Sequence, residues 1–169
     1  MRKRTAALLV CGALAPGVAG VALATPPSGL TSELLARGAA GQFRIHDESM
    51  GLKMEARRDT DVAVVKATLA PGGTTGWHGH PGPSIVIVKT GTLTMREGGH
   101  GHHHGHSHGG WRRCSEQEFP AGTSFVHPEH EHEFVNDSGV AVEFYVVYLV
   151  PAGATPLLND VATPPRECS

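Results

Sequence analysis

Short apolar runs separated by turn-forming residues dominate the chain from Gln42 onward. Gly, Pro and an Asn-Asp pair lie between these runs, which is the pattern of strands joined by turns rather than of long helices. We therefore predict one antiparallel sandwich or barrel, an all-β fold. The long apolar run Val140–Val150 fits a central strand covered on both faces. The expected strands are Gln42–His46, Met54–Arg58, Val62–Leu69, Ser84–Lys89, Thr92–Arg96, Gly110–Arg113, Glu116–Phe119, Ser124–His127, His132–Asn136 and Val140–Val150.

The N-terminus has the pattern of an export signal. Three basic residues, Arg2 to Arg4, precede the small and apolar run Ala6–Ala24. Its last residues give the small-x-small cleavage pattern before Thr25, so we predict a signal peptide over residues 1–24 and an exported mature chain. The destination would be secreted, periplasmic or cell-wall space. A retained membrane anchor is the alternative, because the run is long enough to span, although Pro16 weakens it.

The rest of the chain is expected to form a single domain. Its length of 169 residues suits one core, and no internal repeat is visible. Thr31 and Gly38 bound a segment that looks like a short helix, with Thr31 as N-cap and Gly38 at the stop. The expected organisation is a leader with this helix at 25–40, a barrel at 41–155 and a tail at 156–169.

Charge and aromatic content limit the partners. The net charge is −2, and without the three basic residues of the signal 11 basic residues face 16 acidic ones, which gives −5. This leaves no basic surface for nucleic acid, and 5% aromatic residues give no obvious stacking platform. We expect a metal ion and a small molecule as partners, no nucleic acid, and no membrane after signal cleavage. The oligomeric state stays open.

Cysteine usage agrees with export. Of three cysteines, Cys11 lies in the predicted signal, which leaves Cys114 and Cys168 in the mature chain. Disulfides persist in oxidising compartments, so we expect a Cys114–Cys168 bridge. The alternative is a pair of unrelated thiols.

One segment, Gly98–Gly110, is of low complexity and rich in histidine. It has no apolar side chain and cannot bury enough surface to offset its ordering entropy, so we expect a disordered loop. Neutral imidazoles bind zinc, nickel and copper, which makes the loop a candidate accessory metal site. The alternative is a tolerated insertion with incidental metal affinity. The histidines are His100, His102, His103, His104, His106 and His108.

Other histidines lie on or beside predicted strands. His78 and His80 are two residues apart, and so are His130 and His132. Side chains two apart on an extended strand point to the same face, so each pair can aim at one point. Imidazole is the commonest protein ligand for transition metals. The spacing therefore indicates a site for a divalent metal such as Zn, Fe, Ni, Mn or Cu.

These histidines belong to two spaced motifs. The first reads Gly72-x5-His78-x-His80-x3-Ser84-x6-Gly91, and the second has Pro120-x-Gly122 and, after a longer loop, His132-x3-Asn136. Together they resemble the cupin superfamily motifs G-x5-H-x-H-x3,4-E-x6-G and P-x-G-x2-H-x3-N. The resemblance implies a double-stranded β-helix, a jelly-roll barrel, that holds a metal inside. It also implies His78, His80 and His132 as metal ligands.

The chain departs from the family pattern at two places. Ser84 stands where the family has a glutamate ligand, and a hydroxyl is a poor ligand for such metals. Thr123–Glu129 lengthens the second motif. His130 can replace the missing glutamate or lie at the rim, and we favour the rim. We expect His127, beside Pro128, to be a loop residue.

A site with three histidines leaves coordination positions open, as catalytic metal sites do. Whether the protein is an enzyme stays open, because no base or substrate contact is evident. The preferred hypothesis is an exported metal-binding cupin-domain protein that handles metal or a small ligand. The alternatives are a non-haem metal-dependent oxygenase that uses the same site and a structural cupin with a vestigial site.

Overall fold

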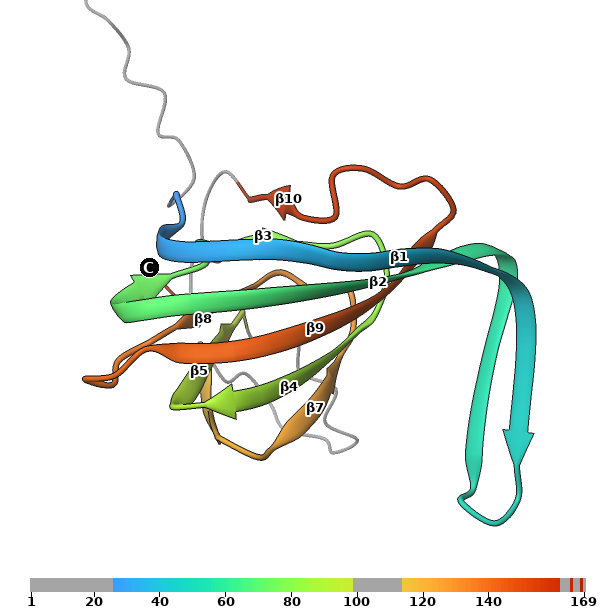
Figure 1. The fold of residues 1–169 in the computed structure, drawn as a ribbon, viewed down its shortest axis with the longest axis horizontal. Coiled ribbons are helices and arrows are strands. Elements are labelled where there is room, and N and C mark those ends of the chain that lie inside the picture. The colour runs from blue at the N-terminus through green and yellow to red at the C-terminus, as the bar shows by residue number, and fades with distance from the viewer. Residues whose placement is uncertain (1–25, 99–113, 162–164, 166–167, 169) are drawn as a thin grey trace, which may run out of the picture.

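The computed structural model describes residues 26–98, 114–161, 165 and 168 (Figure 1). The predicted signal peptide, the six histidines of the Gly98–Gly110 segment and the expected strand Gly110–Arg113 lie outside these residues. Within the described ranges, no helix has the length and apolarity that a bilayer crossing requires.

The described chain is a nearly closed antiparallel barrel, consistent with a jelly roll. The main path of the sheet runs β10-β3-β8-β2-β9-β4-β7, with β1 paired to β2 and β5 paired to both β6 and β8. The strands are β1 (Ser28–Asp47), β2 (Leu52–Thr74), β3 (His78–Gly79), β4 (Ser84–Thr90), β5 (Thr92–Glu97), β6 (Ser115–Pro120), β7 (Ser124–His127), β8 (His132–Val135), β9 (Val142–Pro151) and β10 (Asn159–Asp160).

β9 is a central strand of the sheet, as its apolar sequence predicts. It lies between β2 and β4 and pairs with both along most of its length. Alternate residues from Val142 to Val150 are buried, and the residues between them are half-buried. Because strand side chains alternate between faces, the fully buried set points into the barrel. The core consists of Ala63, Ala67, Leu69, Val86, Val88, Leu93, Met95, Phe119, Phe134, Val142, Phe144, Val146, Tyr148 and Val150.

The short helix expected at Thr31–Gly38 is wrong. These residues belong to β1, where Thr31 pairs with Thr68 and Gly38 with Val62 of β2. The capping pattern is a local signal, whereas pairing along β2 satisfies the backbone groups of the whole segment. Tertiary pairing of this kind overrides weak local propensity.

The far ends of β1 and β2 form a hairpin that projects beyond the barrel (Figure 1). The expected strands Gln42–His46 and Met54–Arg58 are the two sides of this hairpin. Its tip exposes Met50, and Ile45 is half-exposed on one side. These residues add little to the core, so the site depends on the barrel alone.

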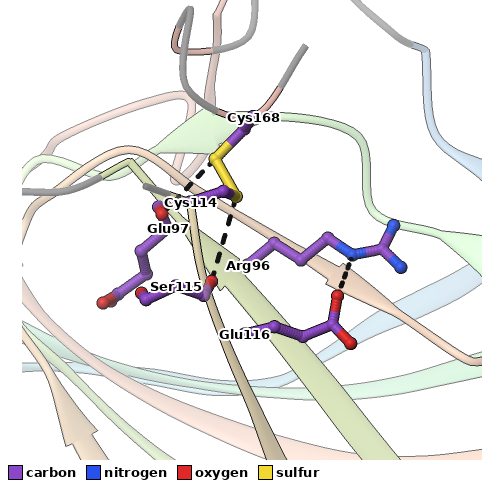
Figure 2. The surroundings of a disulfide bond; sticks show 6 residues. All are labelled: Arg96, Glu97, Cys114, Ser115, Glu116 and Cys168. Carbon is purple, nitrogen blue, oxygen red and sulfur yellow. Dashed lines mark hydrogen bonds and ion pairs between the residues drawn. A yellow bond between two sulfur atoms is a disulfide. The ribbon is translucent and has the colours of Figure 1, made fainter. Parts of the chain in front are cut away.

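The C-terminal segment returns to the mouth of the barrel. Leu157 and Leu158 pack against the core, and β10 then pairs with β3. Further on, Cys168 forms a disulfide with Cys114, as expected from the cysteine usage (Figure 2). The Cys168 Sγ lies 3.4 Å from the backbone oxygen of Glu97 at the end of β5. The bridge therefore ties the tail to the start of β6, which follows the histidine-rich segment, beside the end of β5.

Candidate metal centre

Four histidines from three parts of the barrel meet in its interior. His78 lies on β3, and His80 follows it in the turn before β4. His132 begins β8, opposite His78, and His127 ends β7. All four side chains are buried. Each reaches the interior because it lies on an inward-facing position at a strand end or in the adjoining turn.

Three of these histidines form a compact cluster. One ring nitrogen from each of His80, His127 and His132 lies within 4.8 Å of the others. The ring centroids are 3.9 Å apart for His127 and His132, and 5.3 Å apart for His80 and His132. Three imidazole nitrogens at such separations suit one transition-metal ion, whose bonds to His nitrogen are about 2.0–2.1 Å for zinc.

Backbone carbonyls fix the tautomer of two cluster members. The Nδ1–H of His80 donates to the carbonyl oxygen of Gly82, and the Nδ1–H of His132 donates to that of His130 at 2.9 Å. A neutral imidazole that donates through Nδ1 carries its lone pair on Nε2. Metal-bound histidines are oriented in this way by an acceptor on the other nitrogen.

His127 is oriented in the reverse sense by a carboxylate. Its Nε2–H donates to the Glu97 Oε1 at 2.6 Å, which places the lone pair of the neutral ring on Nδ1. Among the described residues, this buried Nδ1 has no hydrogen-bond partner. An unpartnered polar atom in the interior is costly. A metal ion would satisfy it, so the residues present fit such an ion.

The electrostatics favour uncharged rings at His80 and His132. The pKa of His80 is lowered to about 4, mainly by burial, while the hydrogen bond to Gly82 opposes this and the nearby His127 and His78 add to it. Burial likewise holds the pKa of His132 well below its ordinary value, with His78 and His127 lowering it further. Neutral imidazole is the form that binds a metal.

Ser84 explains how His127 reaches the cluster. This serine stands at the position of the family glutamate, and its Oγ lies 3.5 Å from the His80 Nε2. In the β4–β7 pair, Ser84 lies directly opposite His127. Side chains opposite each other in an antiparallel pair have Cβ atoms about 4.5–5.5 Å apart. The short serine therefore leaves room that the imidazole from the neighbouring strand fills.

The two other histidines of the sequence motifs take different places. The Nδ1–H of His78 donates to the carbonyl oxygen of Gly76 at 2.9 Å, and its ring centroid lies 4.3 Å from that of His132. It borders the cluster without belonging to the three nitrogens, so its role as a ligand stays a prediction. His130 is half-exposed and contributes its backbone oxygen to His132.

The expectation that His127 is a loop residue is wrong, because it ends β7 and is buried. The signal was present in the sequence. On the expected strand Ser124–His127, alternation places His127 on the same face as Phe125, which packs against the core, while Val126 is exposed.

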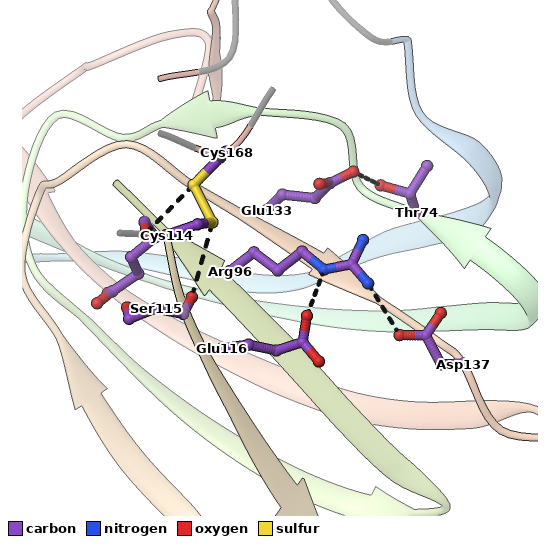
Figure 3. Close-up of polar contacts among 9 residues, drawn as sticks. Thr74, Arg96, Cys114, Ser115, Glu116, Glu133, Asp137 and Cys168 are labelled. Carbon is purple, nitrogen blue, oxygen red and sulfur yellow. Dashed lines mark hydrogen bonds and ion pairs between the residues drawn. A yellow bond between two sulfur atoms is a disulfide. The ribbon is translucent and has the colours of Figure 1, made fainter. Parts of the chain in front are cut away.

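Charged groups surround the outer side of β8 and β5 (Figure 3). The carboxylate of Glu133 accepts a hydrogen bond from the Thr74 Oγ1 at 2.6 Å, on the side of β8 away from His132. Arg96 forms ion pairs with Glu116 at 2.9 Å and Asp137 at 3.2 Å. These contacts hold the strands without adding charge to the cluster.

A cavity of about 340 Å³ opens beside the cluster. One wall carries His78, and another carries Tyr148, whose ring centroid lies 5.5 Å from that of His80. Burial raises the pKa of Tyr148 well above its ordinary value, so its hydroxyl stays neutral. The cavity thus reaches the edge of the candidate metal centre.

Comparison with known proteins gives a likeness in fold. No protein-family model matches the sequence, and no curated protein matches it. The polyketide cyclase RemF from Streptomyces resistomycificus is 19% identical, with a TM-score of 0.51 over 84% of this chain and 78% of that chain. Peruvianin-I, a cysteine peptidase from Thevetia peruviana latex, is 16% identical, with a TM-score of 0.50 over 79% and 68%.

Cupin structures are also among the matches. A Cupin_2 domain of an XRE family transcriptional regulator from Enterobacter cloacae is 15% identical, with a TM-score of 0.44 over 73% of this chain and 97% of that domain. Identities this low speak to the fold and not to the activity. The matches with RemF and Peruvianin-I show a shared fold, and the likeness to cupins rests on the two sequence motifs. The barrel contains a three-histidine cluster that could hold a metal.

Proposed function

We propose that this protein binds one divalent transition-metal ion through His80, His127 and His132. The observation that carries the proposal is the buried and unpartnered Nδ1 of His127 within a cluster of three imidazoles. Imidazole ligands suit zinc, copper, iron and nickel better than magnesium or calcium. Three protein ligands leave at least one coordination position for water or a small molecule.

The proposed role is the handling of a metal or a small ligand outside the cytoplasm. Export rests on the signal-like N-terminus, and the Cys114–Cys168 disulfide is compatible with an oxidising compartment. The histidines of the Gly98–Gly110 segment would supply further, weaker metal sites near neutral pH. We propose these as accessory to the barrel site.

Metal counting tests the proposal. The protein is purified without affinity resin, with the six histidines of the Gly98–Gly110 segment replaced by serine, so that the barrel site is counted alone. We expect one equivalent of metal per chain, and its loss in His127→Gln and His132→Gln. The matched control is His46→Gln, because His46 is exposed on the projecting hairpin and should keep the full equivalent. If the protein with the six loop histidines replaced contains no metal, the proposal is refuted, and the alternative of a structural barrel with a vestigial site is favoured.

A further variant separates two possible ligand sets. The sequence motifs give His78, His80 and His132, whereas the cluster contains His127 in place of His78. We expect His78→Gln to retain metal. Loss of metal in His78→Gln together with its retention in His127→Gln would refute the cluster assignment.

A metal-dependent oxygenase is a second candidate function. One observation favours it, namely the cavity that borders His78 at the edge of the cluster. Bound iron would supply the redox chemistry, and the chain would position a substrate in the cavity. Oxygen uptake by iron-loaded protein, compared with the iron-loaded His132→Gln variant, distinguishes turnover from binding.

A further inference from the structure

The cavity beside the candidate metal centre is partly open and is lined by residues of several strands and of the C-terminal segment. Its floor is formed by inward-facing residues of β2 and β9, including Val65 and Val146. The segment 156–158 covers it, and β10 continues that segment by pairing with β3, the strand of His78. A volume of about 340 Å³ lies within the range of small-molecule sites, about 300–1,000 Å³.

The lining is apolar. Among the described residues, none that lines this cavity is Lys, Arg, Asp or Glu. In the metal-free protein, a carboxylate or ammonium group placed against these walls would lose its hydration without gaining a charged side chain as partner among the lining residues. The walls therefore favour an uncharged ligand.

Polar groups converge at one end of the cavity. Thr75 is already engaged, because its Oγ1 accepts a hydrogen bond from the Phe134 N–H at 2.8 Å. His78 and Tyr148 also line this end of the cavity and adjoin the cluster, and Ser32 lines the cavity from β1. A ligand with one hydroxyl or carbonyl group at its end could meet them while its body lies against the apolar walls.

We infer that this cavity binds a neutral, largely apolar small molecule, of the size of a bicyclic phenol, with its single polar group beside His78. The inference deepens the proposed function, because it names the ligand class that would lie next to the metal centre. The inference rests on the shape and chemistry of the cavity and not on a bound metal. The proposals of metal binding and of ligand binding can therefore be refuted independently.

The test compares two probes with the same ring system and different charge. The full-length protein, stripped of metal with a chelator and checked by metal analysis, is titrated at pH 7 with 2-naphthol and with 2-naphthoate by isothermal calorimetry. We expect 2-naphthol to bind once per chain and 2-naphthoate to bind at least about tenfold more weakly, because its carboxylate would lose hydration. Equal or tighter binding of 2-naphthoate would overturn the neutral ligand class.

Two variants locate the probe. Val65→Phe fills the cavity and should weaken 2-naphthol binding at least about tenfold, whereas Val64→Phe on the opposite face of the same strand should leave it unchanged. Leu157→Lys adds a cation to the half-buried segment 156–158 that covers the cavity, without filling its interior. It should lower the preference for 2-naphthol over 2-naphthoate about tenfold. If Val65→Phe and Leu157→Lys both fold and both bind 2-naphthol and 2-naphthoate as the parent protein does, the probe lies elsewhere and the inference is refuted.

A variant that loses the metal separates the test of the cavity from the test of the metal site. His127→Gln should lose its metal and still bind 2-naphthol within about threefold of the parent protein, since His127 does not line the cavity. Binding of 2-naphthol by a protein that never takes up metal would refute the proposed function and leave the cavity assignment intact. Metal uptake without binding of 2-naphthol would refute the cavity assignment and leave the proposed function intact.

Discussion

Glu97 orients His127, the proposed metal ligand that the sequence motifs do not contain. Its Oε1 accepts the Nε2–H of His127 at 2.6 Å, and its side chain is about 29% exposed. In Glu97→Gln the neutral amide oxygen can still accept this hydrogen bond, but the negative charge of the carboxylate beside the ring is lost. Removal of such a supporting partner typically lowers metal affinity about 10–100-fold. This corresponds to roughly 1.4–2.7 kcal/mol of binding free energy.

Competition with a zinc chelator measures this change, again in the background without the six histidines of Gly98–Gly110. The matched control is Glu116→Gln on the neighbouring strand β6, because Glu116 pairs with Arg96 and makes no contact with His127 among the described residues. We expect Glu116→Gln to stay within about twofold of the parent protein. Equal affinities in the two variants would show that the charge of Glu97 does not support the metal site.

Three further predictions concern stability. Because the pKa values of His80 and His132 are lowered in the folded barrel, the unfolded chain binds more protons between the ordinary value of 6.5 and about 4. Metal-free protein should therefore lose stability as the pH falls through this window, by on the order of 2 kcal/mol after allowance for solvent screening, as denaturant titrations at pH 7.5 and 5 would show. Gly82→Ala should lower the melting temperature and the metal affinity together, because an added Cβ would overlap the Leu149 carbonyl oxygen and shift the acceptor of His80. Cys114→Ser opens a loop of 54 residues and should cost at most about 4 kcal/mol in denaturant unfolding.

Much of the barrel could be predicted from local pattern. The alternating or apolar runs of β4, β5, β7 and β9 are visible in the sequence because burial imposes a period of two. The N-terminal segment could not be placed in this way. In β1, Leu34 and Leu35 are adjacent and both are largely exposed, so no alternation distinguishes a strand from a helix. Its pairing with β2 is a long-range contact.

The candidate site was predicted in part, for a similar reason. His80 and His132 follow from the motif spacing and from strand alternation. His127 depends on the pairing of β4 with β7, which brings it opposite Ser84. A missing glutamate indicates that something else fills its space, but only the register between two strands shows which residue does so.

The position of β7 has a consequence for the integrity of the fold. This four-residue strand lies at the end of the sheet path, where a short strand has a neighbour on one side only. If it slipped by one residue along β4, Val126 would turn inward and the imidazole would face solvent. An ion held jointly by β7, β8 and the turn after β3 would penalise that slip and lock the correct alignment. Loading the protein with metal would then also protect an otherwise open sheet edge from pairing with other chains.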